Sequence, residues 1–164
     1  MPVNDALLAE YDHEIATTRR FLERVPAPAA AWRPHPKSAA LGELAVHLAT
    51  LPWWLEVALT TTELELSTTP HPPAFSTVET LLATFDRNAA AGRVALAATA
   101  DAGFAVPWAL KSGGKTIFSL PRAGVVRSFV LSHLIHHRAQ LGIYLRLRDV
   151  PLPSCYGPSA DSGA

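Results

Sequence analysis

The sequence predicts an all-α protein: one up-and-down four-helix bundle with a short irregular or hairpin segment before the last helix. Two observations support this fold class. Apolar residues recur at three- and four-residue spacing over four long stretches, as they do on the buried face of a helix. Segments rich in proline or glycine separate these stretches and would end each helix. Four helices joined by connections of moderate length favour a bundle, antiparallel or with a crossover, over a sheet protein.

The first two helices have candidate caps and breakers at their ends. Asn4 or Asp5 could cap helix one, which would end at Pro26. The proline-containing segment 31–37 cannot be helical and reads as a stiff connection to a cap at Ser38. The apolar stripe of helix two is Leu41, Leu44, His47, Leu48, Leu51 and Leu55.

The third helix and the segment after it carry different patterns. Ser76 and Glu79 fit a capping box, and the helical pattern then continues to about Thr99. Beyond it, the runs 106–110 and 115–118 flank Ser-Gly-Gly, which suits a short hairpin or an ordered loop.

The last helix is expected from about Val125 to about Arg148, with Pro121 near its start. It is apolar nearly all round, as expected of a helix packed on several sides. We therefore assign residues 1–150 to the bundle and residues 151–164 to an extended C-terminal tail.

Composition and charge exclude several classes of function. The chain has 164 residues, 49% of them hydrophobic, which suits a single domain with a substantial core. Fourteen Lys and Arg residues balance fourteen Asp and Glu residues, so no overall field attracts nucleic acid. The N-terminus is acidic, unlike an export signal, and every apolar stretch is interrupted by charges or proline. We expect a soluble cytoplasmic protein that binds neither nucleic acid nor a membrane.

Three histidines are predicted to point into the bundle. His133 and His137 are four residues apart, so they lie about 40° apart around a helix axis and roughly 6 Å apart along it. His47 lies mid-stripe on helix two, where an unpaired imidazole would lose hydration. With Cys155 as the only cysteine, a metal site must use histidine and carboxylates. Each histidine alone suits an ordinary packed residue, but together they predict an open divalent-metal site.

Residues near these histidines have two interpretations each. Glu43, one turn before the helix-two histidine, either orients a ligand or caps its helix. Arg138 either binds an anionic substrate group or pairs with a carboxylate. His136 is rotated by about 100° from its neighbour and suits a partner contact or a supporting role. Metalloproteases with a His-Glu-x-x-His motif use its glutamate as a general base. This chain has Leu134 at that position, which argues against a protease.

Three further features of the sequence bear on the site. Pro52 should bend helix two, which either widens a pocket or improves packing. Trp53 and Trp54 suit the core, a dimer surface or the wall of an apolar pocket. The segment 112–116 ends like a phosphate-binding loop, but its first glycine is replaced by Ala109, so nucleotide binding is rejected.

Four stretches, 32–36, 41–48, 133–141 and 156–161, resemble the DinB-like (DinB/YfiT-type) superfamily of bacterial metal-dependent four-helix bundles. The resemblance covers almost the whole chain. Its most specific part is the helix-two histidine combined with the His-x-x-x-His-Arg run of the last helix. It implies that His47, His133 and His137 bind a divalent metal, with zinc and nickel foremost, and that the protein is a homodimer.

The resemblance also bears on activity. Some relatives are transferases or isomerases that use the metal to activate a low-molecular-weight thiol such as mycothiol or bacillithiol, and others are labelled hydrolases. An open site without an evident protein base favours a thiol-dependent transferase or isomerase acting on a small electrophile. The alternatives are a metal-assisted hydrolase and a non-catalytic metal- or ligand-binding bundle. The sequence identifies no catalytic residue beyond the metal ligands.

Overall fold

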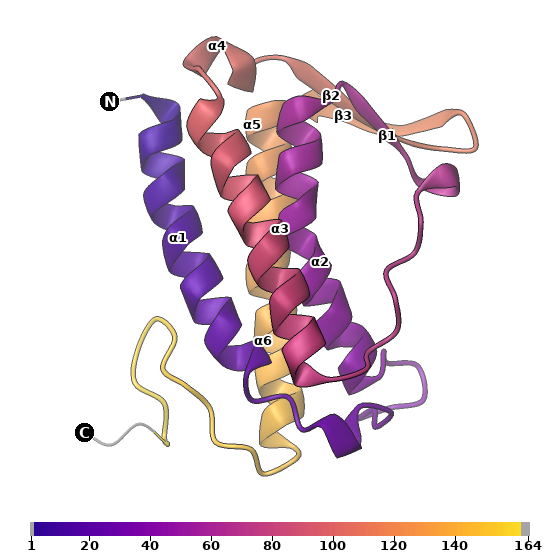
Figure 1. The fold of residues 1–164 in the computed structure, drawn as a ribbon, viewed down its shortest axis with the longest axis vertical. Helices are drawn as coiled ribbons and strands as arrows, with labels where there is room; N and C mark the ends of the chain where they lie inside the picture. Colours follow the sequence, from indigo (N-terminus) through magenta and orange to yellow (C-terminus); the bar gives the residue numbers. More distant parts are fainter. Residues whose placement is uncertain (1, 162–164) are drawn as a thin grey trace.

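The computed structural model describes residues 2–161. Four long helices lie side by side along the longest axis of the molecule (Figure 1). They are α1 (Val3–Leu22), α2 (Leu41–Thr60), α3 (Val78–Ala98) and α6 (Ser132–Arg146). The last helix continues without a break from α5 (Arg122–Val125) through the π-helical segment η3 (Val126–Leu131). Shorter helical elements are η1 (Ala27–Ala29), η2 (Leu66–Thr68) and α4 (Asp101–Phe104).

Three strands make the all-α assignment wrong. β1 (Glu63–Glu65) pairs in parallel with β2 (Pro107–Ser112), and β2 pairs in antiparallel with β3 (Lys115–Pro121). The predicted hairpin is present, and its turn uses Gly113 and Gly114, both with positive φ. β1 gave no sequence signal because a three-residue strand is too short to show periodicity.

The order of helix directions also differs from an up-and-down bundle. Figure 1 shows α2 and α3 running the same way, with α1 and α6 opposite to them. Consistent with this, the Asn88 side chain of α3 donates to the Ala49 carbonyl of α2 at 3.0 Å, and one turn later Gly92 lies against Pro52. The connection 61–77 therefore returns along the length of the bundle. About 17 extended residues suffice to span a 20-residue helix of about 30 Å.

The sheet covers the end of the bundle where α2 finishes and the last helix begins (Figure 1). Trp108 of β2 is fully buried there, among Val57 and Ala58 of α2 and Val125 of α5. Its indole N–H donates to the Thr61 hydroxyl at 3.1 Å. Burying the large indole with its polar atom bonded fixes the sheet to both helices.

Helix starts differ by a few residues from those predicted. α2 is capped at Ala40 rather than Ser38, and the Glu43 carboxylate accepts the Ala40 N–H at 2.6 Å. The capping interpretation of Glu43 is therefore confirmed. At α3 the cap is Thr77, whose hydroxyl accepts the Thr80 N–H, one residue later than predicted. α1 begins at Val3, one residue before Asn4 and two before Asp5, the two predicted caps.

Arg138 pairs with a carboxylate, as one of its two interpretations stated. Its guanidinium is 2% exposed and lies 2.5 Å from the Glu14 carboxylate of α1. It also donates to the Tyr156 hydroxyl at 2.8 Å, and that hydroxyl donates to Glu14 at 2.8 Å. The ion pair thus joins α1, α6 and the chain after α6. Residues 162–164 of the predicted tail lie outside the described residues.

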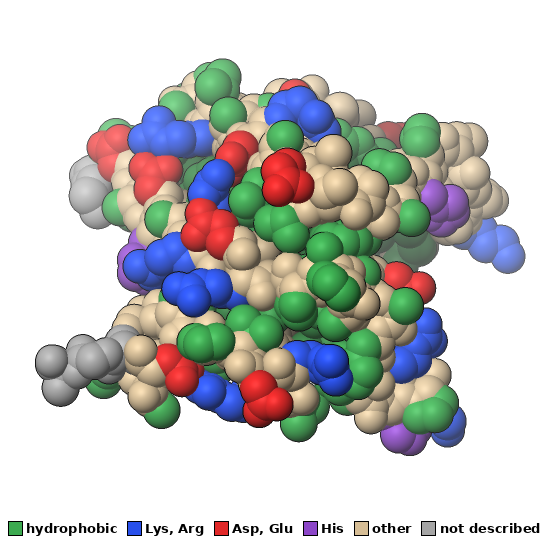
Figure 2. All heavy atoms as spheres, turned by 60° about the horizontal axis from the view of Figure 1, so that its bottom comes forward, with side chains coloured by type: hydrophobic (Ala, Val, Ile, Leu, Met, Phe, Trp, Pro, Cys, Tyr) green, Lys and Arg blue, Asp and Glu red, His purple; other side chains and the backbone are tan. Residues whose placement is uncertain are grey.

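No helix within residues 2–161 combines the length and apolarity needed to span a membrane. Figure 2 shows acidic and basic side chains interspersed over one face of the molecule.

Candidate metal centre

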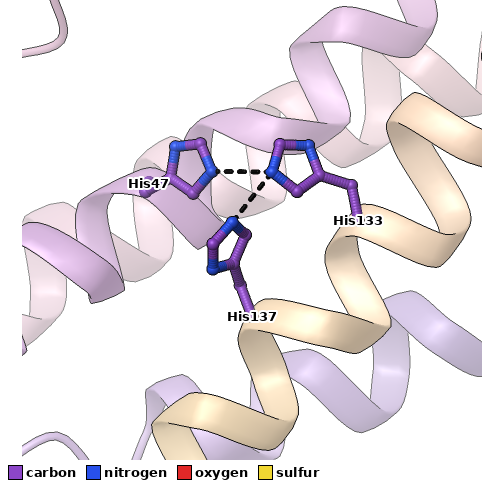
Figure 3. A group of neighbouring side chains, drawn as sticks. All are labelled: His47, His133 and His137. Atoms are coloured by element: carbon purple, nitrogen blue, oxygen red, sulfur yellow. Dashed lines mark hydrogen bonds between the residues drawn. The ribbon is translucent and has the colours of Figure 1, made fainter.

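The structure brings His47, His133 and His137 together between α2 and α6. Their rings point toward one another (Figure 3). The Nε2 atom of His133 lies 3.2 Å from Nε2 of His47 and 2.8 Å from Nε2 of His137. One ligand atom from each residue lies within 4.8 Å of the other two. Three such nitrogens can reach a single ion at bonds of about 2 Å.

The hydrophobic core positions the two helices that carry these side chains. Leu48 of α2 and Leu134 of α6 are fully buried in one cluster. Each follows a histidine of the group directly, His47 or His133. Because neighbouring helix residues are rotated by about 100°, the leucines enter the core and the imidazoles stay half-buried at its edge.

A π-helical turn precedes the two histidines of α6. The Ser132 N–H donates to the Arg127 carbonyl, five residues earlier, instead of four as in an α-helix. His133 follows immediately, and its Nδ1 lies 3.3 Å from the Phe129 carbonyl oxygen. The π turn rotates the rest of the helix relative to a regular one, and so contributes to the direction in which these rings point.

Oxygen atoms face Nδ1 of both α6 histidines and favour one tautomer of each ring. Nδ1 of His133 faces the Phe129 carbonyl, and Nδ1 of His137 lies 2.7 Å from Oε1 of Gln140. An oxygen acceptor requires that Nδ1 carries the hydrogen, which leaves a lone pair on Nε2. The Nε2 lone pairs therefore face one another at hydrogen-bond distance. Such an arrangement is repulsive unless a proton or a cation lies between them, so the donor set fits a divalent metal ion.

Burial favours the neutral imidazoles that metal binding needs. Desolvation lowers the pKa of His47 to about 4, with smaller effects from His137 and His133. The pKa of His133 and the pKa of His137 are also lowered, in both cases mainly by desolvation. Neutral rings at pH 7 have lone pairs available and need to release no proton on binding a metal.

Other predicted residues lie outside the cluster. The His136 ring is exposed, with its centroid 4.9 Å from that of His137. Trp53 and Trp54 pack partly buried against the cluster around Trp108, so the core interpretation holds for them. Gln140 was not indicated by the sequence. Its only signal was a position three residues after His137, on the same helix face.

Two hollows adjoin the histidines. A cavity of about 540 Å³ is bounded by His47 on α2 and by segments 30–33 and 71–75. A shallower hollow of about 380 Å³ lies beside His133 and His136. Both are open to solvent, so a small molecule can reach His47 from one hollow and His133 from the other.

The loop that resembles a phosphate-binding motif has its amides occupied. The N–H groups of Gly113 and Gly114 both donate to the Glu65 carboxylate at 2.9 Å. Glu65 therefore fills the position that a phosphate would need, in agreement with the rejection of nucleotide binding.

Known proteins share this fold. No protein of curated function matches the sequence. A DinB-like protein from Bacillus cereus has a TM-score of 0.70 at 19% identity, over 93% of this chain and 97% of its own. A DinB-like protein from Bacillus subtilis also has a TM-score of 0.70, at 13% identity, over 94% and 99%. At these identities the likeness shows the fold alone.

Family membership is shown by the sequence itself. The DinB superfamily matches residues 10–141, which include all three clustered histidines and most of the bundle. The predicted resemblance is confirmed, and the chain belongs to the DinB superfamily.

Proposed function

We propose that His47, His133 and His137 bind one divalent metal ion and that the protein is a metal-dependent enzyme. The convergence of three imidazole Nε2 atoms supports this proposal most directly. Three imidazoles leave further coordination positions open for a substrate, which is typical of catalytic sites rather than structural ones. The two adjoining hollows agree with an open site. Zinc and nickel are the ions proposed, since imidazole ligands suit both.

The proposed reaction is the transfer of a low-molecular-weight thiol to a small electrophile, or a thiol-dependent isomerisation. When bound, the ion would lower the pKa of a thiol beside it. In a transfer, sulfur forms a bond to the electrophilic carbon as the carbon–halogen or epoxide carbon–oxygen bond breaks. A thiol needs less help from a protein base than water does. Glu43, the one carboxylate among the residues lining the cavity beside His47, is already engaged by the Ala40 N–H.

A metal-assisted hydrolase is the second candidate, and His136 supports it. This exposed histidine lines the shallow hollow together with His133. An imidazole there could accept a proton from an attacking water. Such an enzyme turns over its substrate without any thiol, which separates it from the first candidate.

A substrate panel tests the proposal. Zinc- and nickel-loaded protein is incubated with alkyl halides, epoxides and conjugated enones, with and without bacillithiol or mycothiol. The proposal expects product only with both metal and thiol, and at least about a hundredfold less with His47→Ala. His35→Ala is the matched control, because His35 is exposed and lies outside the cluster.

The outcomes separate the candidates. Turnover of ester or amide substrates without thiol would contradict the transferase proposal and favour the hydrolase. Bound metal without turnover in either arm, together with a large fall in melting temperature on chelation, would indicate a non-catalytic bundle.

We further propose that the protein is a homodimer. Ile143 and Leu147 are 61% and 55% exposed and lie one turn apart on and just after α6, so they form an apolar surface. Light scattering should give twice the monomer mass, and Ile143→Lys should shift the protein toward the monomer. A monomeric wild type would contradict the proposed dimer but not the proposed metal site.

A further inference from the structure

The cavity beside His47 has a mixed lining that suits a particular kind of molecule. Its apolar wall includes Val46 of α2 and Phe75 of the connection before α3. Its charged or titratable side chains are Arg33, Glu43, His47 and His71. A volume of about 540 Å³ lies within the usual range for small-molecule sites.

Arg33 has hydrogen-bond donors that the described chain does not use. Its nearest acidic neighbour is Glu43, with the guanidinium nitrogen 4.0 Å from the carboxylate oxygen, too far for a hydrogen bond. Within residues 2–161 the guanidinium donates to no other group. The same Glu43 oxygen instead accepts the Ala40 N–H at 2.6 Å. An arginine at the edge of a cavity, with its donors free, can bind an anion.

The backbone around Arg33 is fixed against α2. The Leu41 N–H donates to the Trp32 carbonyl at 2.8 Å, and the Gly42 N–H donates to the Ala30 carbonyl at 2.9 Å. At Gly42 an added Cβ would lie only 3.0 Å from Cβ of Phe75. The segment that carries Arg33 and the segment opposite it are therefore both held close to the start of α2.

We infer that this cavity binds a small organic carboxylate, with Arg33 holding the carboxylate and Val46 and Phe75 packing against the apolar body. The planar guanidinium matches a carboxylate through two parallel hydrogen bonds. Phosphate has no apolar body for Val46 and Phe75 to contact, so this lining favours an organic carboxylate. The inference rests on the proposed function, because His47 lines the same cavity as Arg33. It adds that the electrophile carries a carboxylate.

The test uses benzoate as ligand and the full zinc-loaded chain as protein. Calorimetry measures affinity, and amide chemical shifts locate the ligand. We expect benzoate to shift the amide signals of Val46 and Phe75 and to bind at least about tenfold more tightly than the neutral benzamide. Arg33→Gln should weaken benzoate binding by about tenfold or more, while Arg33→Lys should retain part of the affinity. Zinc content should not change in either variant.

Arg93→Gln is the matched control. Arg93 is also an exposed arginine, but it donates to Asp12 at 2.8 Å and lies between α1 and α3, outside the cavity. Its substitution should leave benzoate affinity unchanged. Equal loss of affinity in Arg33→Gln and Arg93→Gln would indicate a general charge effect and overturn the inference.

Three further results would overturn it: unchanged benzoate affinity in Arg33→Gln, phosphate or benzamide binding as tightly as benzoate, or shifts confined to other parts of the chain. The same titration on metal-free protein separates this inference from the proposed function. If the wild type binds no zinc, the proposed metal site fails. Benzoate binding that still depends on Arg33 would then leave the carboxylate site standing.

Discussion

The Nε2 atoms of His133 and His137 lie 2.8 Å apart on successive turns of α6, while the Nδ1 atom of each ring faces an oxygen. This relationship distinguishes the pair from two histidines that share a helix face by chance. Ordinary packed histidines would use a ring nitrogen to satisfy one another or the backbone. In this pair the Nδ1 atoms face away from the cluster and already have oxygen partners. The converging Nε2 atoms are left as acceptors.

The first prediction concerns the ligands. His47→Ala, His133→Ala and His137→Ala should each lower zinc affinity by about a hundredfold or more, since each removes one of three protein ligands. His136→Ala should change it by much less, because that ring lies outside the cluster. Calorimetry on metal-free protein and metal analysis of the purified variants measure both effects. Equal metal retention in all four variants would remove the basis of the site.

The second prediction concerns Gln140 as a positioning residue. Gln140→Leu removes the acceptor for Nδ1 of His137 and should weaken zinc binding by about 10- to 100-fold. Gln140→Glu keeps an acceptor and should retain or increase the affinity. Ser132→Ala, on the same helix and exposed, is the control. A structural role alone would lower the melting temperature in Gln140→Leu without separating the Leu and Glu variants in metal affinity.

The third prediction concerns the pH dependence of the metal-free protein. The pKa of His47 falls from 6.5 to about 4 on folding, mainly through desolvation. Below about pH 6.5 the unfolded chain therefore binds a proton that the folded chain excludes. Stability should be full above pH 6.5 and decrease as the pH falls to about 4. Thermal unfolding after chelation, followed between pH 7.5 and pH 4, measures this as a falling melting temperature.

His47→Leu supplies the control for the third prediction. It removes this titration and should flatten the profile, though His133 and His137 keep a smaller slope because their pKa values are also lowered. A wild-type melting temperature that does not change over this range would contradict the prediction.

The fourth prediction concerns the link between η2 and the hairpin. The Ser67 hydroxyl, and then the amides of Gly114, Ser67 and Gly113, lower the pKa of Glu65 to about 2. The contribution of the Glu65 carboxylate to stability should therefore be complete above pH 4.5 and disappear as the pH falls through about 2. Amide exchange at the two glycines should increase in Glu65→Gln at neutral pH, and exchange near Tyr11, in the bundle, should not. Equal amide protection at the two glycines in the wild type and in Glu65→Gln would contradict this link.

The sequence predicted the histidine cluster better than the chain topology, for a physical reason. His47, His133 and His137 lie on helix faces whose phase is set by local periodicity, which a sequence carries. The directions of α2 and α3 depend on the path of 61–77, whose prolines and polar residues indicate a break but not its route. β1 likewise depends on pairing with β2, far along the chain.

The sequence also did not predict the π turn or the cavity beside Arg33. The π turn at η3 contains no residue type that marks such a turn in a sequence. The cavity is formed where segments 30–33 and 71–75 meet α2, a contact set by the fold as a whole. Arg138 was predicted as a carboxylate partner, but its partner Glu14 is on α1, which no spacing rule could identify.

The last prediction concerns that buried pair. Removing one partner leaves an uncompensated buried charge, so Arg138→Met and Glu14→Leu should each lower the free energy of unfolding by about 3–5 kcal/mol. The double variant should lose much less than the sum of the two, because it leaves neither charge behind. Tyr156→Phe keeps the pair and should cost less than either single change. Urea unfolding of the four variants measures these energies, and additive losses in the double variant would mean that the two charges do not depend on each other.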